Sequence, residues 1–437
     1  MTQEAARFAP AHTVTDADRS VAEAVAAGLI MQAVDDVGYD GRHVQIGGRE
    51  LLNFGSCSYL GLEQRTELKS GAIDAVERYG TQFSYSRAYL ELSLYRELES
   101  LLATMTGGHA LVAPSTTLAH IAALPVLVEP GDAVIIDQFA HASLHTATAL
   151  LRAAPVVPVR HNRIDQLEEK VALLVQKHRR VWLVVDGLYS MMGDFAPLSQ
   201  IARLLELYPQ LHLYVDDAHC TSWIGAHGRG YALDRLPDRS RVVVALGFAK
   251  AFAVGGAALV FSNEDDMHRV RRCGGPMLFS GPLQPPLLGA AVASARLHLT
   301  PEIAGLQEAL MERIDRTLAL GVARGVSFAA SDRTPIFFVR CGQSSTAFAV
   351  ASALRTQGLY TCVSVFPAVP KNRAGVRFTL SLHNTPEDIE RLMDALATEI
   401  ARLGITARDR PRPSVEREPE RERVVAHAPT SRESWLP

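Results

Sequence analysis

The sequence predicts an α/β fold in which a seven-stranded, mainly parallel sheet lies between layers of helices, with a smaller α+β domain beside it. Seven short apolar runs alternate with helical segments, at residues 110–113, 133–136, 156–159, 181–185, 211–215, 242–246 and 257–261. Because these runs are apolar at consecutive positions, we expect both faces of each strand to be covered, as in a parallel sheet sandwiched by helices. The length of 437 residues is sufficient for two domains.

Periodicity and turn residues predict four elements before the sheet. They are a helix over 16–36, a hairpin over 44–53, and helices over 68–79 and 92–104. Thr15 or Asp16 is suited to cap the first helix. Gly47 and Gly48 are suited to the turn of the hairpin.

The chain after the sheet predicts the smaller domain. Its expected elements are a helical region from the Pro-rich turn at 281–286 to about residue 324, strands at 336–339, 359–365 and 376–380, and a helix at 386–403. We expect residues 1–52 to pack with this small domain, residues 53–288 to form the large domain, and residues 289–406 to form the small one. Residues 407–437 are rich in Arg, Glu and Pro, a composition that predicts a disordered tail.

Composition narrows the function and the compartment. The net charge of −3 gives no electrostatic reason to expect nucleic acid or an anionic membrane as a partner. Five scattered cysteines without a C-x-x-C pair favour a reducing compartment and no structural zinc site. The first residues do not have the order of a signal peptide, and no apolar run is long enough to span a membrane. We therefore expect a soluble, cytoplasmic protein without a metal.

Lys250 is the most informative single residue. It follows the apolar run at 242–246, among Ala, Phe and Gly, with no carboxylate within six residues. Desolvation at such a position lowers the pKa of a lysine toward the neutral amine that attacks carbonyl groups. Taken alone, however, this lysine is more readily explained as a side chain that reaches solvent from a strand end.

Polar residues follow four other runs at the same edge of the predicted sheet. In chain order they are Ser115, Thr116 and Thr117, then His141, then Ser190, then Asp216 and His219. Each has an ordinary explanation as a helix cap, a core histidine or a turn residue. Ligands of open parallel sheets bind beyond the carboxyl ends of the strands, so their collection at one edge indicates a binding site.

This set of side chains matches the needs of pyridoxal 5′-phosphate (PLP). The phosphate needs hydroxyls and free N–H groups at a helix start, the aldehyde needs a lysine amine, and the pyridine nitrogen needs a carboxylate that keeps it protonated. A protonated ring is an electron sink for a carbanion. His141 offers a flat partner for the ring.

The sequence resembles the fold-type-I PLP-dependent transferases and, within them, the α-oxoamine synthase family. The motifs that carry the resemblance lie at 53–62, 137–143, 189–198, 215–230, 249–252 and 366–381. They occur in the family's order and spacing, and the resemblance covers about residues 50 to 400.

The resemblance implies a role for each residue around the ring. Lys250 would form the Schiff base, and Asp216 would pair with the pyridine nitrogen. His219 would hydrogen-bond the phenolic oxygen of the cofactor. His141 would stack on the ring, and Ser190 would lie near the ring substituents.

The resemblance also implies groups for the phosphate, the substrates and a partner subunit. The phosphate would be held by three hydroxyls, those of Ser115, Thr116 and Thr117. Arg377 would bind the carboxylate of the amino acid, and Arg87 would lie near the acyl substrate. Ser280 would reach the phosphate of the neighbouring subunit, which implies a homodimer with shared active sites.

Three features depart from the family pattern. Gly247 stands where the family commonly has Thr or Ser three residues before the lysine, and Gly281 replaces a second hydroxyl after Ser280. The loop at 80–87, which is rich in glycine in the family, carries Phe83 and Tyr85 here. The bulkier loop puts the family's usual long acyl-CoA donor in question.

The leading hypothesis is a PLP-dependent acyltransferase. A small amino acid such as glycine, alanine or serine would lose carbon dioxide or a proton, and the resulting carbanion would attack an acyl-CoA or acyl-carrier-protein thioester to give an α-amino ketone. Lys250 and His219 would handle the protons. The alternative within enzymes is an aminotransferase, or other carbanion chemistry on an amino acid in a specialised biosynthetic pathway.

Two other classes of protein fit the sequence less well. A cofactor-binding scaffold without catalysis is disfavoured because Lys250, Asp216, His219 and Arg377 are all present. A nucleic-acid motor is excluded because it requires a phosphate loop, and no Gly-Lys pair occurs in the chain.

Overall fold

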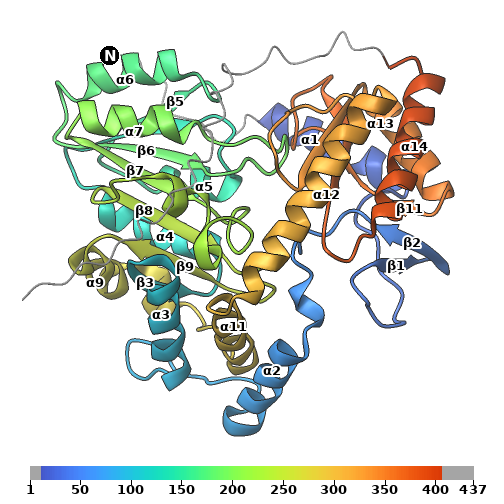
Figure 1. The fold of residues 1–437 in the computed structure, drawn as a ribbon. Helices are drawn as coiled ribbons and strands as arrows, with labels where there is room; N and C mark the ends of the chain where they lie inside the picture. Colours follow the sequence, from blue (N-terminus) through green and yellow to red (C-terminus); the bar gives the residue numbers. More distant parts are fainter. Residues whose placement is uncertain (1–10, 406–437) are drawn as a thin grey trace, which may run out of the picture.

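All seven apolar runs form strands of one sheet in the computed structural model, which describes residues 11–405 (Figure 1). The strands are β3 (His109–Ala113), β4 (Ala133–Asp137), β5 (Val156–Val159), β6 (Val181–Asp186), β7 (Leu211–Asp216), β8 (Val242–Gly247) and β9 (Ala257–Phe261). Their order is β3-β9-β8-β7-β6-β4-β5, and only β9 runs antiparallel to its neighbours. The predicted fold class is confirmed.

Helices cover both faces of the sheet, and alternate strand residues point to each face. One face is covered by α4 (Thr116–Leu127), α5 (Ala142–Ala149), α9 (Glu264–Cys273) and α10 (Gly275–Phe279). The other face is covered by α3 (Ser93–Thr106), α6 (Ile164–Leu174), α7 (Leu198–Leu207), α8 (Tyr231–Arg235) and α11 (Pro285–His298), and α2 (Thr66–Tyr79) packs on α11. Burial on both sides explains why most of these strands carry few polar positions, whereas the edge strand β5 is only partly buried.

The smaller part of the molecule contains two three-stranded sheets, the long helix α12 leads into it, and α1 lies beside it (Figure 1). One sheet has the order β10-β13-β12, with β10 (Ile336–Gly342), β12 (Cys362–Ser364) and β13 (Ala374–Thr379). The other joins β1 (His43–Ile46) and β2 (Arg49–Asn53) to β11 (Leu359–Tyr360). The helices are α12 (Glu302–Arg324), α13 (Ser344–Thr356) and α14 (Pro386–Arg402).

Three details differ from the sequence-based expectations. The first helix, α1 (Ala11–Ala26), begins five residues before the predicted start, so Thr15 and Asp16 lie within the helix and do not cap it. It also ends ten residues early, because Gly28 adopts a left-handed conformation (φ 66°) that closes the helix. The predicted strand at 359–365 is divided between β11 and β12, which belong to different sheets. Helix α13 was not predicted. The predicted tail at 407–437 lies outside the described residues.

Residues 53–62 connect the two parts of the molecule. Their backbone bonds to the smaller part: Thr379 N–H donates to the Phe54 carbonyl (2.9 Å) and Leu382 N–H to the Tyr59 carbonyl (2.8 Å). The Tyr59 side chain instead contacts the large part, where its ring meets Trp223 edge to face at a centroid distance of 6.4 Å. Tyr59 is fully buried, so the core is continuous across this junction.

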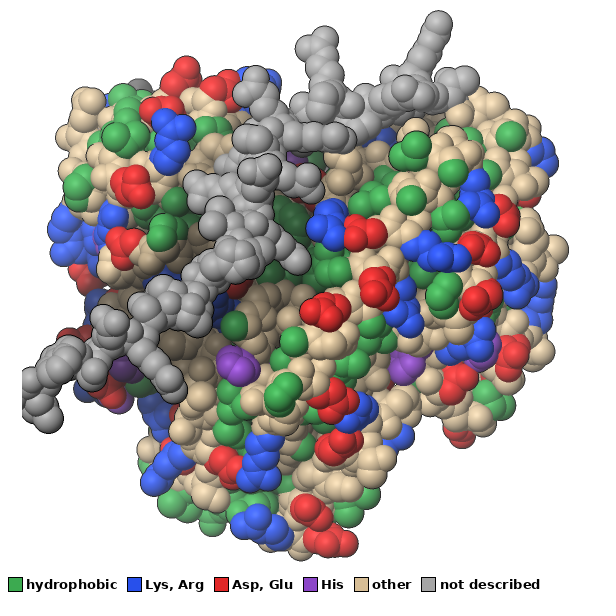
Figure 2. All heavy atoms as spheres, viewed as in Figure 1, with side chains coloured by type: hydrophobic (Ala, Val, Ile, Leu, Met, Phe, Trp, Pro, Cys, Tyr) green, Lys and Arg blue, Asp and Glu red, His purple; other side chains and the backbone are tan. Residues whose placement is uncertain are grey.

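The visible surface mixes both signs of charge. Figure 2 shows Lys and Arg side chains interspersed with Asp and Glu over the face that it presents, without a large area of one sign. Within residues 11–405, no helix combines the length and the apolar character needed to cross a bilayer. In the same range, no three His, Cys, Asp or Glu side chains are grouped to hold a metal ion.

Candidate active site

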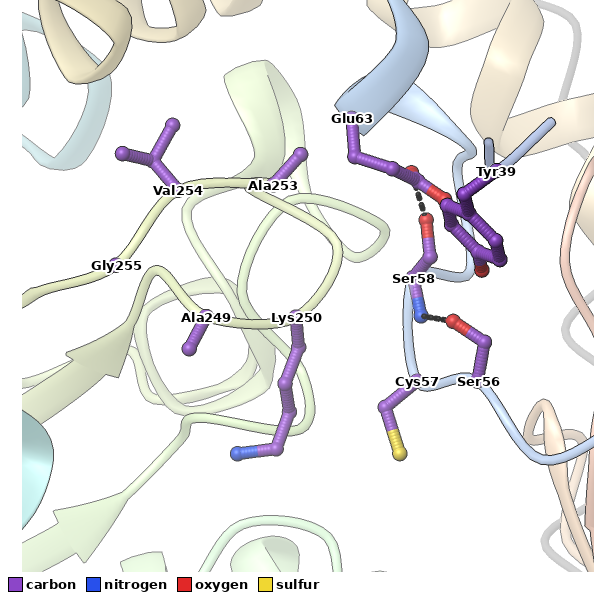
Figure 3. Close-up of a pocket in the computed structure, with 10 residues that line it drawn as sticks. All are labelled: Tyr39, Ser56, Cys57, Ser58, Glu63, Ala249, Lys250, Ala253, Val254 and Gly255. Atoms are coloured by element: carbon purple, nitrogen blue, oxygen red, sulfur yellow. Dashed lines mark hydrogen bonds between the residues drawn. The ribbon is translucent and has the colours of Figure 1, made fainter. Parts of the chain in front are cut away.

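Lys250 lies on the wall of a cavity of about 290 Å³ between the two parts of the chain (Figure 3). One wall consists of residues after β8: Ala249, Lys250, Ala253, Val254 and Gly255. The facing wall consists of Tyr39, Ser56, Cys57, Ser58 and Glu63. The half-buried Lys250 amine has no hydrogen-bond or ion-pair partner among the described residues. It is therefore available to a ligand.

Asp216 ends β7, the strand next to β8, and is buried. Its Oδ2 lies 2.9 Å from His120 Nε2, and its Oδ1 accepts the Ala218 N–H at 3.0 Å. Burial raises the pKa of Asp216, but His120, Lys250 and the Ala218 N–H outweigh this and lower it to about 2. The carboxylate is therefore ionised, as a partner for a protonated pyridine nitrogen must be.

Asp186 is the neighbour of Asp216 in the sheet, paired with it in the register of β6 and β7. Burial and the nearby Asp216 raise the pKa of Asp186 well above its usual range. Its Oδ1 accepts the His141 N–H at 3.0 Å. Two adjacent carboxyl groups thus differ in charge, a difference typical of functional sites.

His219 carries a neutral imidazole and lies near the charges of Lys250 and Arg377. Burial, with the charges of Lys250 and Arg377, lowers its pKa well below the usual value. Its Nδ1 lies 2.8 Å from the Tyr59 hydroxyl. With this hydroxyl as the donor, Nε2 carries the proton and is able to donate to an oxygen of a ligand.

His141 caps α5 at the mouth of β4, where its side chain is exposed. Its Nδ1 lies 2.6 Å from Ser143 Oγ, which fixes the ring. Burial of part of the ring and the charge of Lys250 lower the pKa of His141, although Asp216 opposes them. The ring is consequently neutral at pH 7, as suits a stacking partner.

Ser115, Thr116 and Thr117 begin α4. Ser115 is the N-cap, and its Oγ accepts the Leu118 N–H at 3.2 Å. The half-buried Thr116 and the exposed Thr117 have no side-chain hydrogen bond within the described range. Two free hydroxyls at a helix start are of the type that binds an anion, and the role of these residues in holding a phosphate stays a prediction.

Arg377, on β13, completes the site from the smaller part. Its Nε donates to the Ser190 carbonyl at 2.7 Å, and its Nη2 lies 3.6 Å from Cys57 Sγ. It has no carboxylate partner among residues 11–405. A guanidinium so placed is suited to bind a carboxylate through two hydrogen bonds.

Of the predicted site residues, Lys250 alone is among those that line the cavity, and the side chains of Arg87 and Ser280 are held by other groups of the chain. Arg87 donates to the Val112 carbonyl (2.8 Å) and pairs with Glu91 (3.0 Å) and Glu99 (3.1 Å), so its donors are occupied within the chain. Ser280 donates to the Pro276 carbonyl at 2.6 Å. A role for either residue in binding stays a prediction.

The two glycines that depart from the family pattern differ in their surroundings. A Cβ atom at Gly247 would lie 2.5 Å from the Cβ of Ala218, closer than such atoms approach. A Cβ atom at Gly281 would meet no atom within 4 Å. The missing hydroxyl at Gly247 is therefore enforced by packing, whereas the one at Gly281 is not.

The structure adds residues that sequence reasoning did not select. Asp186 follows an apolar strand exactly as Asp216 does, so the same signal was available. His120 lies one helical turn beyond Thr116, but nothing in the sequence shows that this face of α4 is turned toward β7. Cys57 and Tyr59 lie in a loop without regular periodicity.

The arrangement fits PLP. An unpartnered amine and an ionised carboxylate lie on the neighbouring strands β8 and β7, and free hydroxyls begin the helix after β3. These are the donor types that the aldehyde, pyridine nitrogen and phosphate require. Fold and site together define a fold-type-I PLP-dependent transferase.

Comparison with known proteins identifies the family. A sequence profile described as aminotransferase class I and II matches residues 49–396. The chain is 31% identical over 357 residues to the 8-amino-7-oxononanoate synthase of Thermoanaerobacter pseudethanolicus, covering 80% of this chain and 88% of that protein. It is 33% identical over 376 residues to that of Geobacter sulfurreducens, covering 84% and 93%.

Solved structures agree on the fold. A serine palmitoyltransferase from S. paucimobilis, solved with PLP and myriocin bound, superposes with a TM-score of 0.82 at 22% identity, covering 90% of this chain and 99% of that one. The chain belongs to the aminotransferase class I and II family, and its relatives place it among the α-oxoamine synthases, which are PLP-dependent acyltransferases. The predicted cofactor and reaction class are confirmed, and transamination is not favoured.

Proposed function

We propose that this cavity joins a small amino acid to an acyl thioester, with Lys250 as the covalent attachment point of PLP. The observation that carries the assignment is the unpartnered Lys250 amine beside the ionised Asp216. Bound PLP supplies an electron sink for a carbanion at Cα of the amino acid. Asp216 holds the proton on the pyridine nitrogen that makes the ring effective in this role.

The remaining residues orient the two reactants. His219 donates from Nε2 to the phenolic oxygen of the cofactor, and His141 covers one face of the ring. Ser190 lies near the ring substituents, and its carbonyl holds the Arg377 guanidinium. Arg377 binds the carboxylate of the amino acid, and the neutral His219 is able to move a proton beside the amine of Lys250.

The phosphate is held by Ser115, Thr116 and Thr117. Gly247 lacks the hydroxyl that the family commonly has at this position. The acyl donor is an acyl-CoA or an acyl-carrier-protein thioester. The cavity of about 290 Å³ would have to hold the cofactor as well as the amino acid, which supports a small amino acid. Glycine, alanine and serine are the candidates.

A homodimer with shared sites is part of the proposal. Large apolar side chains gather beside Ser280: Phe279 is 87% exposed, and the loop bonded to α10 through Ser86 Oγ and the Leu278 carbonyl (2.5 Å) exposes Tyr89 at 83%. Exposed apolar groups of this size mark protein interfaces. A second copy that covers them would bring Ser280 into the partner's site.

The dimer is tested by light scattering after size exclusion. Phe279→Asp is expected to yield a monomer, whereas Val322→Asp, at an equally exposed position on α12, should not. A Phe279→Asp protein that keeps the mass of a dimer contradicts this interface.

The five cysteines are all free, which supports the proposed cytoplasmic location.

The attachment of PLP is tested by absorbance. Lys250→Ala should lose the visible band of the lysine-bound cofactor, and Lys69→Ala, on the exposed face of α2, should keep it. An unchanged band in Lys250→Ala would refute the assignment of Lys250 as the attachment point of PLP.

Acyl transfer is tested by incubating the enzyme with each amino acid and an acyl thioester. Release of free thiol supports the proposal, and keto-acid formation without thiol release refutes it.

A further inference from the structure

His120 occupies a position beneath the candidate site that the proposed function leaves without a role. It lies in the middle of α4, and its side chain is fully buried against β7. Its Nδ1 is 2.9 Å from the Tyr214 hydroxyl, and its Nε2 is 2.9 Å from Asp216 Oδ2. Tyr214 and Asp216 are two residues apart on β7, so they point to the same face of the sheet.

The contacts determine which imidazole nitrogen carries a proton. The ionised Asp216 only accepts hydrogen bonds, so the short contact requires a proton on Nε2 of His120. Burial and the charge of Asp216 raise the pKa of Tyr214 well above its usual range, so its hydroxyl keeps its proton and is able to donate to Nδ1. Tyr214, His120 and Asp216 thus form a buried chain of hydrogen bonds that ends on a single carboxylate oxygen, Oδ2 of Asp216.

This chain distinguishes two otherwise similar carboxyl groups. Asp186 and Asp216 end neighbouring strands at the same register, and both are buried. Adjacent carboxyl groups resist simultaneous ionisation, so one of them tends to retain a proton. Only Asp216 receives an imidazole N–H, whereas Asp186 receives a backbone N–H from His141. The imidazole of His120, together with Lys250 and the Ala218 N–H, thus favours ionisation of Asp216, and His120 is the largest of these contributions.

We propose that His120 is a positioning residue that selects Asp216 as the ionised member of the pair and turns it toward the pyridine nitrogen. This inference rests on the proposed assignment of Asp216 as the partner of that nitrogen. His120 and the Ala218 N–H occupy one lone pair on each oxygen of Asp216, which leaves acceptor capacity for the cofactor. Since α4 also begins with the phosphate hydroxyls, one helix serves both ends of the cofactor.

The test is nitrogen-15 NMR of holoenzyme loaded with PLP labelled at the pyridine nitrogen, whose shift reports ring protonation without turnover. His120→Leu removes the donor and should move the signal toward the unprotonated ring. A hydrogen bond to a charged group contributes about 1.5–3 kcal/mol, so we expect a change of about tenfold to a hundredfold in the ring protonation equilibrium. His120→Gln, which retains an N–H, should restore part of the native shift.

Controls separate this role from a general loss of packing. His298→Leu alters another fully buried histidine, one that bonds to the Ser294 carbonyl and to no carboxylate, and should leave the signal unchanged. Tyr214→Phe removes a single oxygen, and should shift the signal in the same direction as His120→Leu but less. Tyr214→Phe therefore tests the same chain of hydrogen bonds if His120→Leu does not fold.

Asp216→Asn separates the role of His120 from the assignment of Asp216, because it removes the charge of the proposed partner of the pyridine nitrogen. If Asp216→Asn moves the signal while His120→Leu and Tyr214→Phe do not, the role of His120 is overturned and the site assignment stands. If Asp216→Asn leaves the signal unchanged, the assignment of Asp216 fails, and the inference fails with it.

Discussion

Replacement of His161 by glutamine is expected to destabilise the protein in a pH-dependent way. His161 follows β5 and lies between two carboxylates at the edge of the site. Its Nδ1 is 3.1 Å from Asp137 Oδ1, and its Nε2 is 2.7 Å from Asp194 Oδ2. The side chain is 15% exposed, so solvent screens these contacts only weakly.

The magnitude follows from the pKa of the histidine. Burial lowers the pKa of His161, but the hydrogen bonds to Asp137 and Asp194 outweigh burial and raise it to about 9. The ordinary value is 6.5. A difference of roughly 2.5 units corresponds to about 3 kcal/mol of stability. Because the folded pKa is raised, this contribution is fully present below pH 6.5 and is lost as the pH rises through about 9.

The assay is urea unfolding of the native protein and the His161→Gln variant at pH 6 and at a pH above 9. We expect a loss of about 3 kcal/mol at pH 6 and a much smaller loss at the higher pH. The half-buried His178, whose ring bonds to the Gly131 carbonyl (3.3 Å) and to no carboxylate among the described residues, provides a control, and His178→Gln should show no such dependence. Equal losses for His161→Gln at both pH values would refute the reasoning.

Two further predictions concern departures from the family and the substrate. Gly247→Thr should lower the unfolding free energy by about 1–3 kcal/mol through overpacking against Ala218, whereas Gly281→Thr should leave it unchanged; calorimetry that ranks them equally contradicts the packing argument. Arg377→Lys should raise KM for the amino acid about tenfold while PLP absorbance is kept, because lysine lacks the bidentate fork; an unchanged KM argues against a carboxylate at Arg377.

The sheet could be predicted from sequence because both of its faces are buried. The strands are mostly apolar along their length, and five of them, β3, β4, β6, β7 and β8, are followed at one edge of the sheet by the polar residues of the candidate site. Strand ends that share a sheet edge converge by topology alone, so Lys250 and Asp216 could be placed together. This placement does not depend on how distant segments of the chain pack.

Features that depend on packing between distant segments could not be predicted. The pattern of residues 359–365 is that of one strand, and only the presence of two separate sheets divides it. Arg87 matched a substrate residue by position, yet Glu91 and Glu99 occupy its donors. His120 resembles any buried helical histidine until the rotation of α4 relative to β7 is known.

The junction at residues 53–62 bears on how tightly the cavity holds its ligands. Phe54 and Tyr59 are fixed by backbone hydrogen bonds to the smaller part and by buried contacts to the larger one. The wall that carries Cys57 is thereby ordered when the chain folds, not when a substrate arrives. Little conformational entropy remains to be lost on binding, and such preorganisation leaves more of the contact energy as affinity.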